Sequence, residues 1–181
     1  SFPTRRSSDL VRTSWKIQRD CQQRGYDSQK VLQQLRHREA DSKQFIDSQA
    51  QKADLIVQFE APDSYSMDMA ERGHPLSPKL RITVWNDYDL QQIGTILQQS
   101  GTSATVLVDP LDLNRVTMVL DSEPSTETLL NLRENLFPCL RHVTRSSIAP
   151  SWREGYMGLL QIIALWLIQD SDKNFSEGAA R

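Results

Sequence analysis

The hydrophobic pattern of the first sixty residues predicts helices followed by one short strand. Three helices and the strand are expected over residues 11–24, from residue 28 onward, over 41–53 and over 54–59. The first helix has a partial apolar stripe and a stop at Gly25, and Asp27 or Ser28 supplies the cap of the second. The run 54–59 (DLIVQF) is apolar and rich in β-branched residues, which is typical of a buried or edge strand.

The pattern changes after residue 60. Residues 61–79 contain three prolines, Gly73 and several polar residues, and this composition predicts a linker between two parts of the chain. Beyond it the periodicity alternates between 2 and 3.6, which indicates a small α+β region over 80–181. Its strands are expected over 80–85, 104–108 and 116–120, and its helices over 90–99, 125–136 and 152–169.

Composition excludes several classes of protein. The net charge of −2 in 181 residues provides no strong field for nucleic acid or an anionic membrane surface. The longest apolar stretch, 159–168, is far shorter than the ~20 residues that span a bilayer. Cys21 and Cys139 are far apart and in no CxxC motif, so neither a disulfide framework nor a zinc site is expected, and a reducing cytoplasm is the default location.

The first ten residues require separate treatment. Residues 1–10 (SFPTRRSSDL) lack the apolar core of a signal peptide. They resemble the translation of a sequencing-adapter oligonucleotide, which implies a non-native segment. We therefore expect native sequence to begin near Val11.

The candidate chemistry lies in the first helix, where three cations occur within nine residues. Lys16 and Arg19 share one helical face, and Arg24 follows at the end of the same helix. Phosphoryl transfer depends on positioning and charge stabilisation, so such a cluster suits a site for phosphate groups. A charged helix face is more often simply solvated, and the spacing by itself does not decide between these interpretations. Asp20, inside the motif, is interpreted as a local salt-bridge partner.

The segment WKIQRDCQQRGYDSQKVLQQLRHREADSKQFIDSQAQKADLIVQF, Trp15 to Phe59, resembles the phosphoribulokinases. In that family a Lys is followed three residues later by an Arg and eight residues later by another, as are Lys16, Arg19 and Arg24. The resemblance implies that Lys16 and Arg19 are catalytic residues contacting the transferring phosphoryl group or nucleotide phosphates. It also implies that Arg24 binds the phosphate of ribulose 5-phosphate.

The resemblance further implies an α/β fold: the C-terminal part of a P-loop kinase, with helices on a mixed sheet, over residues 11–60. ATP and Mg²⁺ are the implied cofactors. A P-loop needs a glycine followed by Lys and Ser or Thr, and none of the seven glycines is followed by Lys. The chain is therefore expected to be a fragment that lacks the ATP-binding half, has no metal site of its own and is inactive alone.

Other features depart from the family or leave alternatives open. Ser48 stands where the family has Pro in an IDPQ segment, and residues 80–181 resemble the family only loosely. The C-terminal cysteine pair of plant and cyanobacterial members is missing, so redox regulation is not supported. The implied partners are a sugar phosphate, a homo-oligomer and, for that branch, a glyceraldehyde-3-phosphate dehydrogenase complex; the implied context is cytoplasmic carbon fixation in the Calvin cycle. A non-catalytic paralogue with a regulatory role and a general α+β binding domain are the alternatives.

Overall fold

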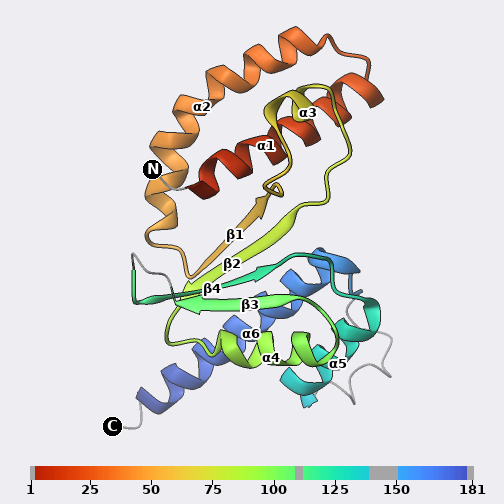
Figure 1. Cartoon of the computed structure of the whole chain (residues 1–181). Helices are drawn as coiled ribbons and strands as arrows, with labels where there is room; N and C mark the ends of the chain where they lie inside the picture. The colour runs from red at the N-terminus through yellow and green to blue at the C-terminus, as the bar shows by residue number, and fades with distance from the viewer. Residues whose placement is uncertain (1–2, 109–111, 139–150, 179–181) are drawn as a thin grey trace. The chain divides into compact units, whose positions relative to one another are not determined.

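Figure 1 shows a computed structural model of the chain, which describes residues 3–108, 112–138 and 151–178. The chain divides into two compact units, and the division falls between Ile82 and Thr83, within one strand. In chain order the elements are α1 (Pro3–Ile17), the π-helix η1 (Gln18–Gln23), α2 (Ser28–Ala50), β1 (Leu55–Glu60), α3 (Met67–Glu71), β2 (Lys79–Trp85), α4 (Leu90–Gln99), β3 (Ala104–Val108), β4 (Arg115–Leu120), α5 (Thr126–Leu136) and α6 (Gly155–Gly178).

The first unit is organised around α1, which contacts α2, α3 and β1 (Figure 1). Helix α1 continues into η1, and the helical segment ends before Gly25. The φ of Gly25 is 73°, which would be strained for any residue with a side chain. Asp27 then caps α2 by accepting a hydrogen bond from the Lys30 amide at 2.9 Å. A small apolar cluster fills the space between α1, β1 and α3. Its buried members are Val11, Ala61, Tyr65 and Ala70.

Two expectations for this unit differ from the structure. The second and third predicted helices are one helix, α2, because no glycine or proline interrupts residues 28–50 and the polar pair at 41–42 sits inside a helix instead of capping one. The side chains of residues 38–48 lie outside the described part. The segment expected as a linker, 61–79, contains α3 and contributes Tyr65 and Ala70 to the apolar cluster, since those two side chains have the neighbours they need on α1.

The strands are hydrogen-bonded in the order β1-β2-β4-β3. β3 and β4 are antiparallel, with Ala104 opposite Leu120 and Val108 opposite Val116. The predicted α/β class is confirmed, although the sheet is antiparallel instead of mixed. Consecutive strands joined by six residues pair in this way because a parallel crossover requires a dozen or more. The turn expected at Asp109-Pro110 lies outside the described residues.

The second unit has a densely apolar interior. One face of α4, with Leu90, Ile93 and Leu97, is fully buried, and the helix contacts β3 and β4. Gly94 permits this approach, because a Cβ there would come within 2.5 Å of a Val106 methyl group. α5 begins at the predicted cap, where the Ser125 hydroxyl accepts from the Thr128 amide. The predicted elements of this half therefore agree closely with the observed ones, and α6 extends beyond its predicted end.

Candidate functional site

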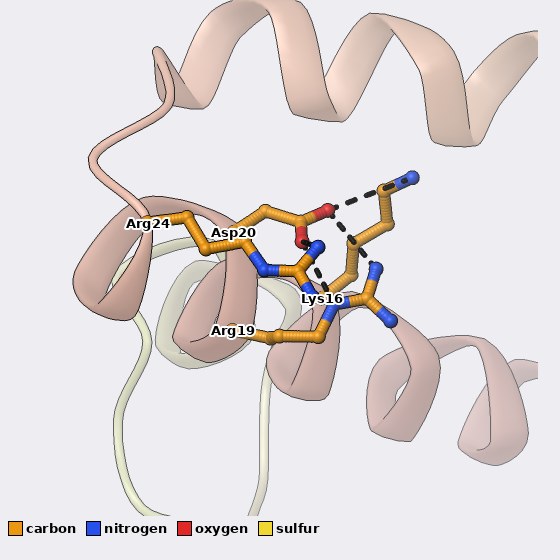
Figure 2. A network of polar contacts seen from close by, with 4 residues as sticks. All are labelled: Lys16, Arg19, Asp20 and Arg24. Atoms are coloured by element: carbon orange, nitrogen blue, oxygen red, sulfur yellow. Dashed lines mark hydrogen bonds and ion pairs between the residues drawn. The ribbon is translucent and has the colours of Figure 1, made fainter.

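Three cationic side chains of the first unit converge on one carboxylate, as Figure 2 shows. Arg19 makes two hydrogen bonds to Asp20, from Nε to Oδ1 at 2.8 Å and from Nη2 to Oδ2 at 3.1 Å. Arg24 Nη1 lies 3.5 Å from Oδ1, and Lys16 Nζ lies 3.9 Å from Oδ2. The structure thus brings together all three cations singled out in the sequence, with Asp20 as their common partner.

The backbone of η1 helps to produce this convergence. Lys16, Asp20 and Arg24 are spaced by four residues, so they follow one side of the helix as it changes from α to π geometry. Asp20 is the buried residue of the π-helix, whereas Arg24 caps its end. π-helical turns are frequent at functional sites, and this one carries the carboxylate that the three cations share.

The four side chains differ in their exposure to solvent. Asp20 and Lys16 have only 8% and 15% of their side-chain surface exposed, whereas Arg19 and Arg24 have 54% and 57% exposed. Asp20 engages two of the five N–H groups of the Arg19 guanidinium. The cluster therefore has a buried anionic centre and an accessible cationic rim.

The electrostatics keep Asp20 ionised. The hydrogen bond from Arg19 is the main cause that lowers the Asp20 pKa, burial opposes the shift, and the charges of Arg19, Lys16 and Arg24 lower the pKa further. The same hydrogen bond raises the pKa of Arg19. A general base works best when its pKa lies near the operating pH, so Asp20 is better suited to act as a counter-ion than as a base.

A second row of side chains fixes this helix to the turn that follows α3. Ser14 Oγ and Gln18 Nε2 donate to the carbonyl of His74 at 3.5 and 3.3 Å, and Gln22 Nε2 donates to the carbonyl of Gly73 at 3.3 Å. These three residues were not among those predicted from the sequence. The four-residue spacing of these three polar residues is the signal that would have revealed them.

One family model matches this part of the chain. Residues 6–64 match the Phosphoribulokinase / Uridine kinase family. Over these residues, about a third of the chain, the sequence is similar to that family. The match includes Lys16, Arg19, Asp20 and Arg24 and begins inside the decapeptide that resembles an adapter. No curated protein matches the chain.

The predicted phosphoribulokinase resemblance is thereby confirmed at the level of the family, and the match to a family of kinases indicates a phosphotransferase. The match ends at Asp63-Ser64, before α3 and the turn at 73–74. Within the described residues, no helix has the length and hydropathy needed to cross a membrane.

The implied cofactors fit the site unequally. The phosphate groups of ATP suit Lys16 and Arg19, because both are cations and the side chain of Arg19 is half exposed. Mg²⁺ does not suit Asp20, whose two oxygens already contact three cations. In the described part of the chain no three His, Cys, Asp or Glu side chains gather as a metal site.

Proposed function

We propose that the cationic cluster is the phosphate-binding part of an ATP-dependent sugar-phosphate kinase, with ribulose 5-phosphate as the acceptor and ribulose 1,5-bisphosphate and ADP as products. One observation carries the proposal: three cations surround a single carboxylate within a segment of the kinase family. Such a cluster retains two uncompensated positive charges. It therefore attracts an anion with more than one negative charge.

In this proposal the residues act by charge and position. Lys16 and Arg19 neutralise the charge that develops on the transferring phosphoryl group, and Arg24 holds the acceptor's own phosphate. Asp20 keeps the cations close together before the phosphates arrive. When bound, ATP supplies the phosphoryl group. The proposal places the P-loop of the kinase and its catalytic base in sequence on the N-terminal side of these residues.

The first test is a binding experiment on the 181-residue chain. Ribulose 5-phosphate and ATP are titrated separately by calorimetry into wild type and into Lys16→Ala, Arg19→Ala and Arg24→Ala. A hydrogen bond to a charged group contributes about 1.5–3 kcal/mol, so each loss should weaken binding by roughly 10–100-fold. Arg24→Ala is expected to affect the sugar phosphate more than ATP, and Arg19→Ala the reverse.

Arg12→Ala is the matched control for this experiment. Arg12 lies one turn before Lys16 on α1 and pairs with Asp9 at 3.5 Å, outside the cluster. The Arg12→Ala substitution also removes one positive charge from this helical segment. The affinities for ribulose 5-phosphate and ATP should stay within about twofold of the wild-type values. Equal losses in Arg12→Ala and Arg19→Ala would reduce the cluster to a general charge effect and contradict the proposal.

A second test concerns the gene. The coding sequence on the 5′ side of Val11 should encode a strand followed by a Gly-rich loop ending in Lys and Ser or Thr. The protein with this sequence restored should consume ATP in the presence of ribulose 5-phosphate. A stop codon or an unrelated sequence at that position would overturn the kinase proposal.

One observation favours a different function, that of a non-catalytic regulatory paralogue: the family match does not continue into the second unit. A protein of this kind would keep the phosphate-binding cluster and lose turnover. Sugar-phosphate binding without ATP consumption by the restored protein would favour it over the kinase.

The proposal extends to location and partners. We place the enzyme in the cytoplasm, acting in carbon fixation through the Calvin cycle, with a homo-oligomeric assembly. If it belongs to the plant or cyanobacterial branch, its partner is glyceraldehyde-3-phosphate dehydrogenase. Co-purification and light scattering of the restored protein test these points separately from activity.

A further inference from the structure

The helix that carries the cationic cluster has two rows of functional side chains on opposite sides. Lys16, Asp20 and Arg24 form the first row, and Ser14, Gln18 and Gln22 form the second. The rows have the same four-residue spacing and are offset by two residues. At about 100° per residue an offset of two is a rotation of roughly 200°, which is close to opposite faces. One row holds charge, and the other contacts the carbonyls at 73–74.

The turn at 73–74 is shaped to receive the second row. Gly73 has a φ of 68°, a conformation that favours glycine, and its carbonyl accepts from Gln22. A Cβ at this position would collide with the amide nitrogen of Gln22 and come within 3.3 Å of an Ile17 methyl group. A side chain at this position would therefore displace the Gln22 amide from the Gly73 carbonyl, in addition to straining the backbone.

Tyr65 connects the same turn to α1 from inside the unit. Its hydroxyl group lies 2.8 Å from the His74 carbonyl and 3.0 Å from Ser14 Oγ, and the residue is only 7% exposed. The His74 carbonyl thus receives contacts from Ser14, Gln18 and Tyr65. Because Tyr65 and the turn lie just beyond the segment matched by the family, they extend the site past residue 64.

We propose that Tyr65 and the turn at Gly73-His74 are positioning elements for the cationic cluster: they hold η1 in its π-helical form and thereby set the arrangement of Arg19 and Arg24 around Asp20. This proposal rests on the proposed function for its consequence, phosphate affinity, but not for its geometry. The physical link is short. Gln18 and Gln22 lie within η1 and flank Arg19 and Asp20 in the chain, so a displaced turn displaces the backbone that carries the cluster.

The test compares two glycine substitutions in the 181-residue chain. Gly73→Ala introduces both a strained φ and the collision with Gln22, whereas Gly101→Ala introduces a similar strain, at φ 82°, with no atom within 4 Å. Two properties are measured: the pKa of Asp20 from its carboxyl ¹³C shift, and the affinity for ribulose 5-phosphate. Gly73→Ala should raise the Asp20 pKa towards its ordinary value and weaken binding by about tenfold. Gly101→Ala should change neither property.

Milder variants cover the case in which Gly73→Ala fails to fold. Tyr65→Phe removes one oxygen atom, and Gln18→Ala with Gln22→Ala removes the two amides; both should shift the two properties in the same direction by smaller amounts. Gln23→Ala, an exposed neighbour in the same π-helix, is the control. Tyr65→Phe with lowered stability but an unchanged Asp20 pKa and affinity would show that the contacts serve folding only and would overturn the proposal.

The two readouts separate the positioning proposal from the proposed function. If wild type binds neither phosphate ligand, the proposed function fails, whereas the Asp20 pKa still reports whether the turn controls the cluster. If wild type binds and every variant of the turn keeps both the affinity and the pKa, the positioning role is refuted and the proposed function stands.

Discussion

The first unit buries carboxyl groups that are paired with arginine side chains, whereas the second unit buries a layer of aliphatic side chains. In the first unit Asp20 and Glu60 are both less than one-tenth exposed and are held by arginines. Among the described residues, the largest fully buried side chains belong to the second unit apart from Leu80 and Ile82. The family match covers the first kind of architecture and stops before the second.

The two units are expected to differ in role, with ligand binding in the first and a contribution to stability in the second. An apolar interior contributes through buried area and packing, which many combinations of similar volume satisfy. A cluster of charges requires particular donors at particular positions and costs desolvation energy, so it is expected where a ligand must be bound. The first unit is therefore where substitutions should change binding, and the second is where they should change stability alone.

The largest effect is expected from a cavity in the second unit. Leu97→Ala removes a side chain with 0% exposure and should lower the free energy of unfolding by about 2–5 kcal/mol, measured by denaturant titration. Met157→Ala, at a side chain that is 57% exposed, should cost less than about 0.5 kcal/mol. The Asp20 pKa should remain unchanged in both variants. A change in the Asp20 pKa would contradict the expectation that substitutions in the second unit affect stability alone.

Glu60→Gln tests whether the first unit depends on its buried charges. Glu60 accepts from Arg81 Nε at 2.5 Å, and their side chains are 10% and 25% exposed. Removing the negative charge leaves a largely buried guanidinium without its ion-pair partner, so the free energy of unfolding should fall by about 3 kcal/mol. The matched control is Arg72→Ala, which breaks an exposed pair with Asp68 and should cost about 0–1 kcal/mol. Equal costs would refute the expectation.

Tyr156 should report the apolar interior of the second unit through its titration. Its pKa is raised to about 12, chiefly by burial and to a smaller extent by the nearby charges of Glu123 and Asp121. The stability that this shift contributes is fully present below about pH 10 and is lost as the pH rises towards 12. The ionisation of Tyr156 is measured from the difference in absorbance between wild type and Tyr156→Phe as the pH is raised. Ionisation near pH 10 would contradict the expected burial.

The smallest effect is expected from Asp20 in acid. Its pKa is lowered, chiefly by the Arg19 hydrogen bond, so its contribution to stability is fully present above the unfolded value of about 3.9. The contribution is lost as the pH falls through the lower folded-state pKa. Unfolding free energies measured between neutral and acidic pH should show this loss in wild type and not in Asp20→Asn. The same acid dependence in both proteins would assign the effect to other carboxylates.

Much of the fold could be predicted because helices and strands are local patterns. The strand at Ala104–Val108, the helix at Leu90–Gln99 and the Ser125 cap all follow from periodicity and capping within a few residues. Helix α3 was missed, since the prolines and polar residues around it are typical of a loop and so short a helix needs tertiary contacts, such as those with α1, to be stable. The role of the three cations stays a prediction; the structure adds that they share Asp20, and the contacts of their helix with Tyr65 and residues 73–74 were not predicted.

The sequence by itself determined the residue types of the site, the elements that carry them and the family of residues 6–64, because each depends on a short stretch of chain. Only the tertiary structure decided that Arg19, Lys16 and Arg24 meet at one buried carboxylate, and that the opposite side of their helix is held by a turn more than 50 residues away. Spacing along a helix specifies a face. The contacts of that face are made with residues distant in the sequence, so they depend on how the whole unit folds.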